Sequence, residues 1–141
     1  MPYLDLNHTS AAALQQHLTK YQTVVACLCA AWCDVCKDYR PKFEALAEQH
    51  PELLFLWIDI EDQASLVGDL DIENFPTLLI QQNDVVSFYG TMQPDTSQLK
   101  RIIQSQARQS PEQLQTQANF DGQQRLWQTE ANLRLRLALA V

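Results

Sequence analysis

Four cysteines fall within ten residues of this chain: Cys27, Cys29, Cys33 and Cys36. The last two are separated by two residues in the segment AAWCDVCKDYRP, residues 30–41. Such a pair can exchange electrons, hold a metal ion or simply fill space. A thiolate attacks a disulfide and a neighbouring thiol then resolves the mixed intermediate, so a CxxC pair suits thiol–disulfide exchange.

The segments on either side of the CxxC pair predict where it lies. TVVACLCA (23–30) is a continuous apolar run that is typical of a strand buried on both faces. From Asp34 to His50 the apolar residues have helical spacing, and Pro41 is expected to kink that helix. Cys33 is therefore expected at a helix N-terminus, where free N–H groups and the helix dipole favour a thiolate. Cys36 follows about one turn later.

Zinc binding is the rival chemistry for these cysteines. Structural zinc sites usually combine two well-separated ligand pairs, whereas Cys27 and Cys29 lie inside a stiff predicted strand. We therefore expect no metal. Packing is the favoured interpretation of Cys27 and Cys29, because cysteine is among the most buried residue types. Two residues apart on a strand, their side chains share one face of the sheet.

The other periodic segments complete an α/β pattern. Strands are predicted at 3–6, 53–60, 76–82 and 85–90, and helices at 9–21, 62–72 and 95–107. The last two strands form a hairpin with its turn at Asn83 and Asp84. The order β-α-β-α-β-α-β-β-α predicts a mixed central sheet with helices on both faces.

Residues 109–141 differ in kind, and we predict a main domain at 1–108 followed by a C-terminal helical extension. The extension is rich in glutamine, and SPEQ (110–113) forms a capping box with proline at the first helical position. Asp121-Gly122 is expected to be a turn. LRLRLALAV (133–141) alternates like a strand, but Leu, Arg and Ala are strong helix formers, so a helix is favoured.

An apolar stripe in the extension must be buried somewhere. Leu126, Leu133 and Leu137 are its members. The stripe can pack on the chain's own domain, on a partner protein or on a second copy of the chain, and the sequence does not choose among them.

Composition narrows the classes of function and location. The chain has 141 residues, enough for one domain with a sizeable core, and its formal net charge of -7 argues against a nucleic-acid surface. No apolar run reaches the length of a membrane span, and MPYLDLNHTS (1–10) lacks the features of a secretory signal. We therefore expect a cytoplasmic protein with reduced thiols and no membrane contact.

The segment AAWCDVCKDYRP resembles the active-site segment of the thioredoxin family: Trp, CxxC, Lys, and a Pro five residues after the second Cys. FPTLLI (75–80) is similar to that family's cis-proline segment, and Gly90 falls where the family places a glycine after its last strand. The resemblance covers about residues 3–107 and implies a thioredoxin-like fold.

The resemblance also implies roles for individual residues. Cys33 would be the exposed nucleophile and Cys36 the more buried resolving thiol. Trp32 would contact the client beside the nucleophile. Pro76 would form a cis peptide bond next to the disulfide, and Phe75 would offer backbone groups to an extended client peptide.

Three departures from the family pattern affect the site. Asp34 and Val35 stand between the cysteines where thioredoxins carry Gly-Pro; Asp34 puts a negative charge beside the nucleophile but also suits a first helical turn. The family's buried acid falls on Cys27, which could serve as a third thiol beneath the pair. The lysine that partners that acid falls near Trp57.

Two functions follow from these residues. The first is a thiol–disulfide oxidoreductase that reduces protein disulfides at Cys33 and Cys36, needs no cofactor and is recharged by a thioredoxin reductase, as the resemblance implies. The alternative is a binding or assembly module whose extension, 109–141, contacts a partner or a second copy, with weak or vestigial redox activity.

Overall fold

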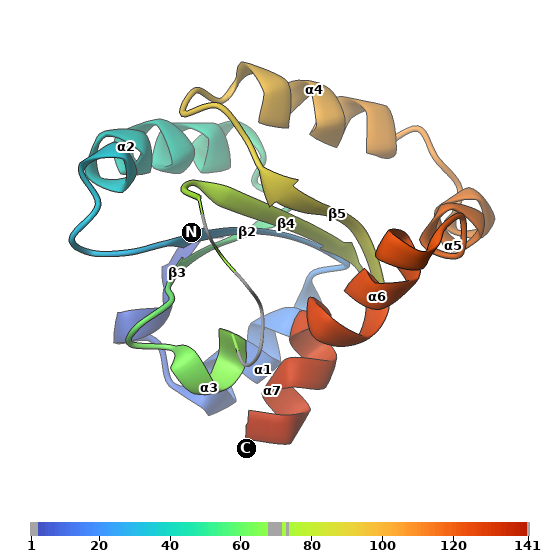
Figure 1. Ribbon diagram of the computed structural model, residues 1–141, viewed down its shortest axis with the longest axis horizontal. Coiled ribbons are helices and arrows are strands. Elements are labelled where there is room, and N and C mark those ends of the chain that lie inside the picture. Colours follow the sequence, from blue (N-terminus) through green and yellow to red (C-terminus); the bar gives the residue numbers. More distant parts are fainter. Residues whose placement is uncertain (1–2, 68–71, 73, 141) are drawn as a thin grey trace.

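A five-stranded mixed sheet forms the centre of the computed structural model, which describes residues 3–67, 72 and 74–140 (Figure 1). The strands are β1 (Tyr3–Asp5), β2 (Thr23–Cys29), β3 (Leu54–Asp59), β4 (Thr77–Gln82) and β5 (Val85–Thr91). They lie in the order β1-β3-β2-β4-β5. β1, β3 and β2 are parallel, whereas β4 is antiparallel to β2 and β5 to β4. The predicted mixed sheet and its closing hairpin are confirmed.

The hairpin between β4 and β5 turns at the residues that the sequence indicates. Asn83 has a φ of 54°, a left-handed conformation that asparagine tolerates better than most side chains. Gly90 lies inside β5, opposite Leu78, within the strand predicted at 85–90.

Helices cover both faces of the sheet, as predicted. They are η1 (Leu6–His8), α1 (Ala11–Lys20), α2 (Asp34–Gln49), α3 (Ala64–Val67), α4 (Ser97–Gln106), α5 (Pro111–Ala118), α6 (Gly122–Glu130) and α7 (Leu133–Ala140). Figure 1 shows α2 and α4 above the sheet and α1, α3 and α7 below it. The helix α3 begins at Ala64, two residues later than in the predicted 62–72, and the expected end near Gly68 lies outside the described residues. Pro41 lies inside α2, which continues to Gln49.

The core has two apolar layers, one on each face of the sheet. Side chains alternate along β2, so that Val25, Cys27 and Cys29 face α2 and α4. Their neighbours, such as Ala26 and Leu28, face α1, α3 and α7. Because both faces are covered, β2 needs apolar residues at every position, which explains its continuous apolar sequence.

The C-terminal extension is helical, as predicted, and the 108/109 boundary lies in the connection between α4 and α5. The predicted capping box is present: the Ser110 side chain accepts from the Gln113 N–H and the Gln113 side chain accepts from the Ser110 N–H. Asp121 caps α6 by accepting from the Gln124 N–H at 2.8 Å, so Asp121-Gly122 begins a helix.

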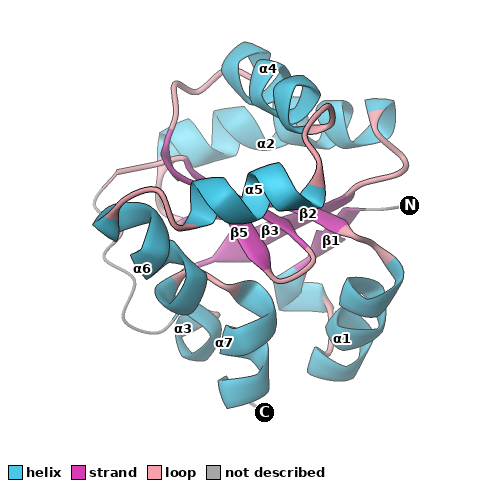
Figure 2. Cartoon of the chain, turned by 90° about the vertical axis from the view of Figure 1, so that its right-hand side faces the viewer, coloured by secondary structure: helices cyan, strands magenta, loops and turns pink. Residues whose placement is uncertain are grey.

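The extension packs on the chain's own domain. Figure 2 shows α5 and α6 alongside β5, and α7 next to α1 and α3. Leu133 and Leu137 are buried in the lower core layer. Leu126 was expected in the same stripe but is 50% exposed, because α6 ends at Glu130 and the new helix α7 begins with a different orientation.

Two glutamine side chains join the extension to the sheet. The buried Gln81 amide on β4 donates to the Asn132 side-chain oxygen at 2.9 Å and accepts from the Leu133 N–H at 2.7 Å. On α6, the Gln128 amide accepts from the Val86 N–H at 2.8 Å and donates to the Val86 carbonyl oxygen at 2.9 Å. These contacts satisfy polar groups that burial would otherwise leave unpaired.

Candidate active site

Cys33 lies at the junction between β2 and α2, as the sequence predicts. It is the N-cap residue of the 16-residue helix α2, with an extended backbone conformation. Its N–H donates to the Ala30 carbonyl oxygen at 3.0 Å, and its carbonyl oxygen accepts from the Lys37 N–H at 3.2 Å. The side chain is half-buried and its thiol is free.

Cys36, one turn into α2, is buried and disulfide-bonded to Cys29 at the end of β2. The two Cα atoms are 5.9 Å apart, within the usual range for a disulfide. Packing was the favoured interpretation of Cys29, but its side chain is bonded to Cys36 in this structure. The roles of Cys33 and Cys36 in exchange stay predictions.

Cys27 occupies the position that the resemblance reserves for an acid. Its thiol is buried 3.7 Å from the Cys29 sulfur, and burial raises the pKa of the Cys27 thiol well above its usual value. A thiol that keeps its proton is a poor substitute for a carboxylate base. On the neighbouring strand, Trp57 is paired with Cys27 and packs on the Phe43 ring, with the Arg40 guanidinium 5.3 Å above the indole. An aromatic cluster therefore replaces the acid–lysine pair.

An exposed aromatic rim lies beside Cys33. The Trp32 side chain is 63% exposed, and its ring stands edge-on to the Phe75 ring with 5.7 Å between centroids. The Trp32 Nε1–H donates to the Glu61 carboxylate at 2.7 Å, which holds the indole in place. The Phe75–Pro76 peptide bond is cis, as the resemblance implies, and the buried Pro76 leads directly into β4.

The two residues between the CxxC cysteines face solvent. Val35 is exposed, and the Asp34 carboxylate lies 3.7 Å from the Lys37 ammonium one turn along α2. Because both partners are exposed, this ion pair adds little to stability. The ion pair does place the positive charge of Lys37 next to Asp34, the acid that stands where the family carries glycine.

Asp59 is a buried carboxylate that our reading of the sequence missed. It ends β3 and accepts hydrogen bonds from the N–H groups of Ala31 at 2.8 Å, Glu61 at 2.9 Å and Asp62 at 3.2 Å. The Asp59 side chain thereby holds two loops in place. One leads to Cys33, and the other carries Glu61, which accepts the hydrogen bond of Trp32. The signal in the sequence is an acid at the end of an otherwise apolar, buried strand.

Asp59 and Cys36 also line a pocket of about 190 Å³. Lys37, Arg40 and Trp57 form other parts of its wall. The pocket places charged side chains and open space next to the buried cysteine of the CxxC pair.

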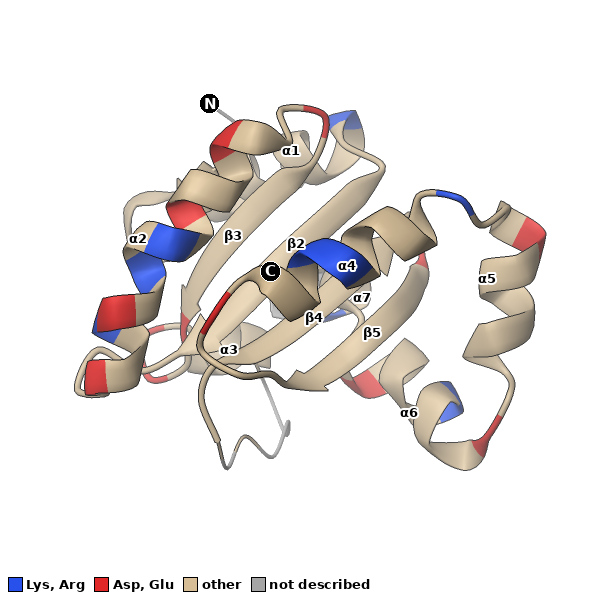
Figure 3. Ribbon diagram, turned by 90° about the horizontal axis from the view of Figure 1, so that it is seen from above, with Lys and Arg blue, Asp and Glu red and all other residues tan. Residues whose placement is uncertain are grey.

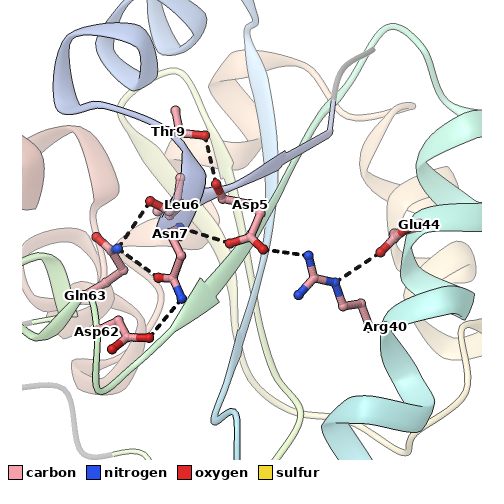
Figure 4. A network of polar contacts seen from close by, with 8 residues as sticks. All are labelled: Asp5, Leu6, Asn7, Thr9, Arg40, Glu44, Asp62 and Gln63. Atoms are coloured by element: carbon pink, nitrogen blue, oxygen red, sulfur yellow. Dashed lines mark hydrogen bonds and ion pairs between the residues drawn. The ribbon is translucent and has the colours of Figure 1, made fainter.

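A polar network that includes part of the pocket wall ties α2 to β1 (Figure 4). The Arg40 guanidinium donates to the Asp5 carboxylate at 2.6 Å and to the Glu44 carboxylate at 3.1 Å. Asn7 accepts from the Gln63 side chain and donates to Asp62 at 2.9 Å. The network holds the first half of α2, and therefore Cys36, in a fixed position relative to the sheet.

Charged residues lie mainly on the helices and loops, and the strands β2, β4 and β5 carry none (Figure 3). Within the described ranges there is no group of three or more His, Cys, Asp or Glu side chains that could hold a metal ion. Nor does any described helix have the length and apolar character needed to cross a membrane.

The fold and the site define an α/β protein with a cysteine pair at a strand–helix junction and a cis-proline directly before β4. The sequence profile of the family described as Thioredoxin matches residues 5–105. The chain therefore belongs to the thioredoxin family.

Comparison with known proteins agrees with this assignment. Over 85 residues the chain is 36% identical to "Thioredoxin-like protein CXXS1" of Oryza sativa subsp. japonica, covering 60% of this chain and 62% of that protein. Over 61 residues it is 30% identical to a thioredoxin of Ophiophagus hannah, covering 43% of this chain and 58% of that protein. The aligned part thus spans about three fifths of each of these relatives.

Solved structures show the same fold. A mutant thioredoxin of Halobacterium salinarum superposes with a TM-score of 0.63 at 24% identity, covering 77% of this chain and 94% of that chain. Fasciola hepatica thioredoxin gives a TM-score of 0.59 at 23% identity, covering 67% of this chain and 92% of that one. Family membership, together with a cysteine pair at bonding distance, supports thiol–disulfide oxidoreductase chemistry.

Proposed function

We propose that this protein reduces disulfides of other proteins by dithiol–disulfide exchange, with Cys33 as the attacking thiol and Cys36 as the resolving thiol. One observation carries the proposal. Cys33 is the half-buried N-cap of α2, free to react, with an exposed aromatic rim on one side and the buried Cys36 one turn behind it.

The reaction proceeds in two exchanges. The Cys33 thiolate attacks one sulfur of the client disulfide, and the other client sulfur leaves as a thiolate. The Cys36 thiol loses its proton and attacks the Cys33 sulfur. The bond between Cys33 and the client breaks, the client leaves with both sulfurs as thiols, and a Cys33–Cys36 disulfide remains. We place this proton transfer at the pocket that Asp59 and Cys36 line.

The rim beside Cys33 supports binding of an extended client segment. Trp32 and Phe75 offer a flat aromatic contact, and the backbone at the cis Phe75–Pro76 bond lies next to it. Val35 adds an apolar contact, and Asp34 with Lys37 adds one charge of each sign. A client that lies across this rim would bring its disulfide to Cys33.

The proposed setting is the cytoplasm, where the glutathione and thioredoxin pools keep thiols reduced and favour reductase rather than oxidase action. A thioredoxin reductase would return the Cys33–Cys36 disulfide to the dithiol. The alternative function, a binding module that acts through 109–141, gains no support from the extension's apolar stripe. Two of its three leucines, Leu133 and Leu137, are buried against the chain's own sheet.

The test is reduction of insulin by the full chain in the presence of dithiothreitol. We expect activity in the wild type, none in Cys33→Ser, and trapped mixed disulfides in Cys36→Ser. Cys27→Ala is the matched control and should keep its activity, because that thiol is buried and protonated. An inactive wild type, or a fully active Cys33→Ser protein, would refute the proposal.

A further inference from the structure

Cys36 is bonded to a cysteine on β2 and also follows a cysteine at the start of its own helix. Cys33 precedes it by three residues at the start of α2, and Cys29 approaches it from the end of β2. The Cα atoms of Cys29 and Cys36 are 5.9 Å apart, which suits a disulfide without movement of the backbone. Cys36 can therefore be the common partner in two alternative bonds.

The two alternative bonds differ in their access to solvent. Cys29 is 1% exposed and Cys36 is 2% exposed, and both belong to the apolar layer between the sheet and α2. Cys33 is half-buried at the helix N-terminus. The reaction proposed above ends with Cys33 inside the disulfide. The structure instead holds the disulfide in the core and leaves Cys33 as a thiol.

We propose that Cys29 is a third redox cysteine, which takes the disulfide from Cys33 and stores it as the buried Cys29–Cys36 bond. This inference rests on the proposed function, because exchange with a client produces the Cys33–Cys36 bond. The Cys29 thiol loses its proton and attacks the Cys36 sulfur. The Cys29–Cys36 bond forms, the Cys33–Cys36 bond breaks, and Cys33 leaves as a thiolate that can take up the proton. The step is an isomerisation, so no oxidant or reductant is consumed.

The stored Cys29–Cys36 form reacts with thiols and with clients differently from a Cys33–Cys36 disulfide. An external thiol cannot readily reach a bond between two buried sulfurs, so reopening begins with attack of Cys33 on Cys36. The oxidised protein then presents one free thiol at the site rather than a disulfide. That thiol can still form a mixed disulfide with a client, but Cys36 is no longer available to resolve it. The client would stay covalently bound until another thiol attacks the mixed disulfide and releases Cys33, which can then reopen the stored bond.

Cys27 is the matched control for this role. It lies on the same face of β2, with its sulfur 3.7 Å from that of Cys29, yet its thiol is free. Cys29 is the last residue of β2 and is bonded to Cys36 on α2, whereas Cys27 lies two residues earlier in the strand and is not bonded to it.

The test maps disulfides in the oxidised full-length protein. Wild type, Cys27→Ala and Cys29→Ser are oxidised with diamide, alkylated with iodoacetamide without denaturant, and analysed by peptide mass spectrometry. In the wild type and Cys27→Ala we expect a Cys29–Cys36 linked peptide and an alkylated Cys33. In Cys29→Ser we expect a Cys33–Cys36 peptide and a fall in Cys33 alkylation on the order of tenfold or more, because its sulfur is then in the bond. An oxidised wild type that contains only Cys33–Cys36, with Cys33 unreactive, overturns the inference.

A second variant keeps the test decisive if Cys29→Ser fails to fold. Cys33→Ser retains both members of the stored bond, and diamide should convert it to a Cys29–Cys36 disulfide. If denaturation and alkylation then label both Cys29 and Cys36, the inference is wrong. The proposed function is judged separately by insulin reduction in the wild type. Active protein that lacks the Cys29–Cys36 bond overturns only the inference, whereas inactive protein with that bond overturns only the function.

Discussion

Replacing Asp59 by asparagine should loosen the loop that leads to the reactive cysteine. The carboxylate accepts three N–H groups, with Oδ2 serving Ala31 and Oδ1 serving Glu61 and Asp62. An asparagine has one accepting oxygen and one donating NH₂ group. If the asparagine oxygen keeps the hydrogen bonds from Glu61 and Asp62, its NH₂ group faces the Ala31 N–H. Both of these groups are donors, so no hydrogen bond forms between them. The loss therefore falls on the residue two positions before Cys33.

The size of the effect follows from the kind of bond that is lost. A hydrogen bond to a charged acceptor contributes about 1.5–3 kcal/mol to the free energy of unfolding. Water can replace part of it, because Ala31 is exposed, so we expect Asp59→Asn to lower that free energy by about 1–2 kcal/mol. The loop also carries Trp32, whose partner Glu61 is held by the same carboxylate. We expect kcat/KM for insulin reduction to fall about three- to tenfold as the rim loses its fixed geometry.

Two measurements on the same protein test this reasoning. Urea unfolding gives the stability change, and insulin reduction gives the rate. Asp62→Asn is the matched control, since Asp62 lies in the same loop but its side chain is exposed and accepts a hydrogen bond from Asn7 at 2.9 Å rather than from the loop before Cys33. Asp59→Asn with unchanged stability would refute the hydrogen-bond argument. Lower stability with an unchanged rate would refute the claim that Asp59 positions the site.

Three further predictions concern the core and the extension. Gln81→Leu should lower the free energy of unfolding in urea by about 2–4 kcal/mol, because it leaves the buried Leu133 N–H unpaired; a variant as stable as the wild type would contradict this. Leu137→Ala should cost about 2–5 kcal/mol in the same assay, whereas the exposed Leu135→Ala should change stability by less than about 0.5 kcal/mol, and equal effects would show that α7 is not docked. Burial raises the pKa of the Cys27 thiol in the folded protein. The contribution of Cys27 to the free energy of unfolding is therefore complete below the unfolded thiol pKa of about 8.5. Above that pH it declines by up to about 1.4 kcal/mol per pH unit, because the unfolded chain ionises the thiol and the folded protein does not. The stability advantage of the reduced wild type over Cys27→Ala should therefore shrink between about pH 7.5 and about pH 9.5, and a constant difference would count against it.

Local patterns in the sequence predicted most of the fold. The segment 23–30 is apolar at every position after Thr23 because both faces of the strand are covered, and that pattern is visible without a structure. The N-cap position of Cys33 follows from the change between strand and helix periodicity. The capping box at Ser110 depends on residues within one turn, so it was also predictable.

Contacts between distant segments could not be predicted in the same way. Alternation along β2 places Cys27 and Cys29 on one face, but only the position of α2 over the sheet decides which one meets Cys36. An aspartate after a strand is usually a surface residue, and the burial of Asp59 depends on two loops that meet over it. The site where the extension packs depends on Gln81. In the sequence this residue has no feature that distinguishes it from other strand residues, and its role is seen only in its hydrogen bonds to Asn132 and Leu133.

The bidentate contact of Gln128 with Val86 has a consequence for work on shortened chains. β5 is the last strand in the sheet order, and an outer strand offers unpaired N–H and C=O groups to any other extended chain. The Gln128 amide occupies one such pair of groups much as a sixth strand would, while α5 and α6 cover the strand beside it. A chain cut after Ala107 would keep every cysteine yet expose this edge, and sheets from different molecules could then join and aggregate. Loss of activity in such a fragment would therefore be explained by aggregation and would not show that the extension takes part in the redox reaction.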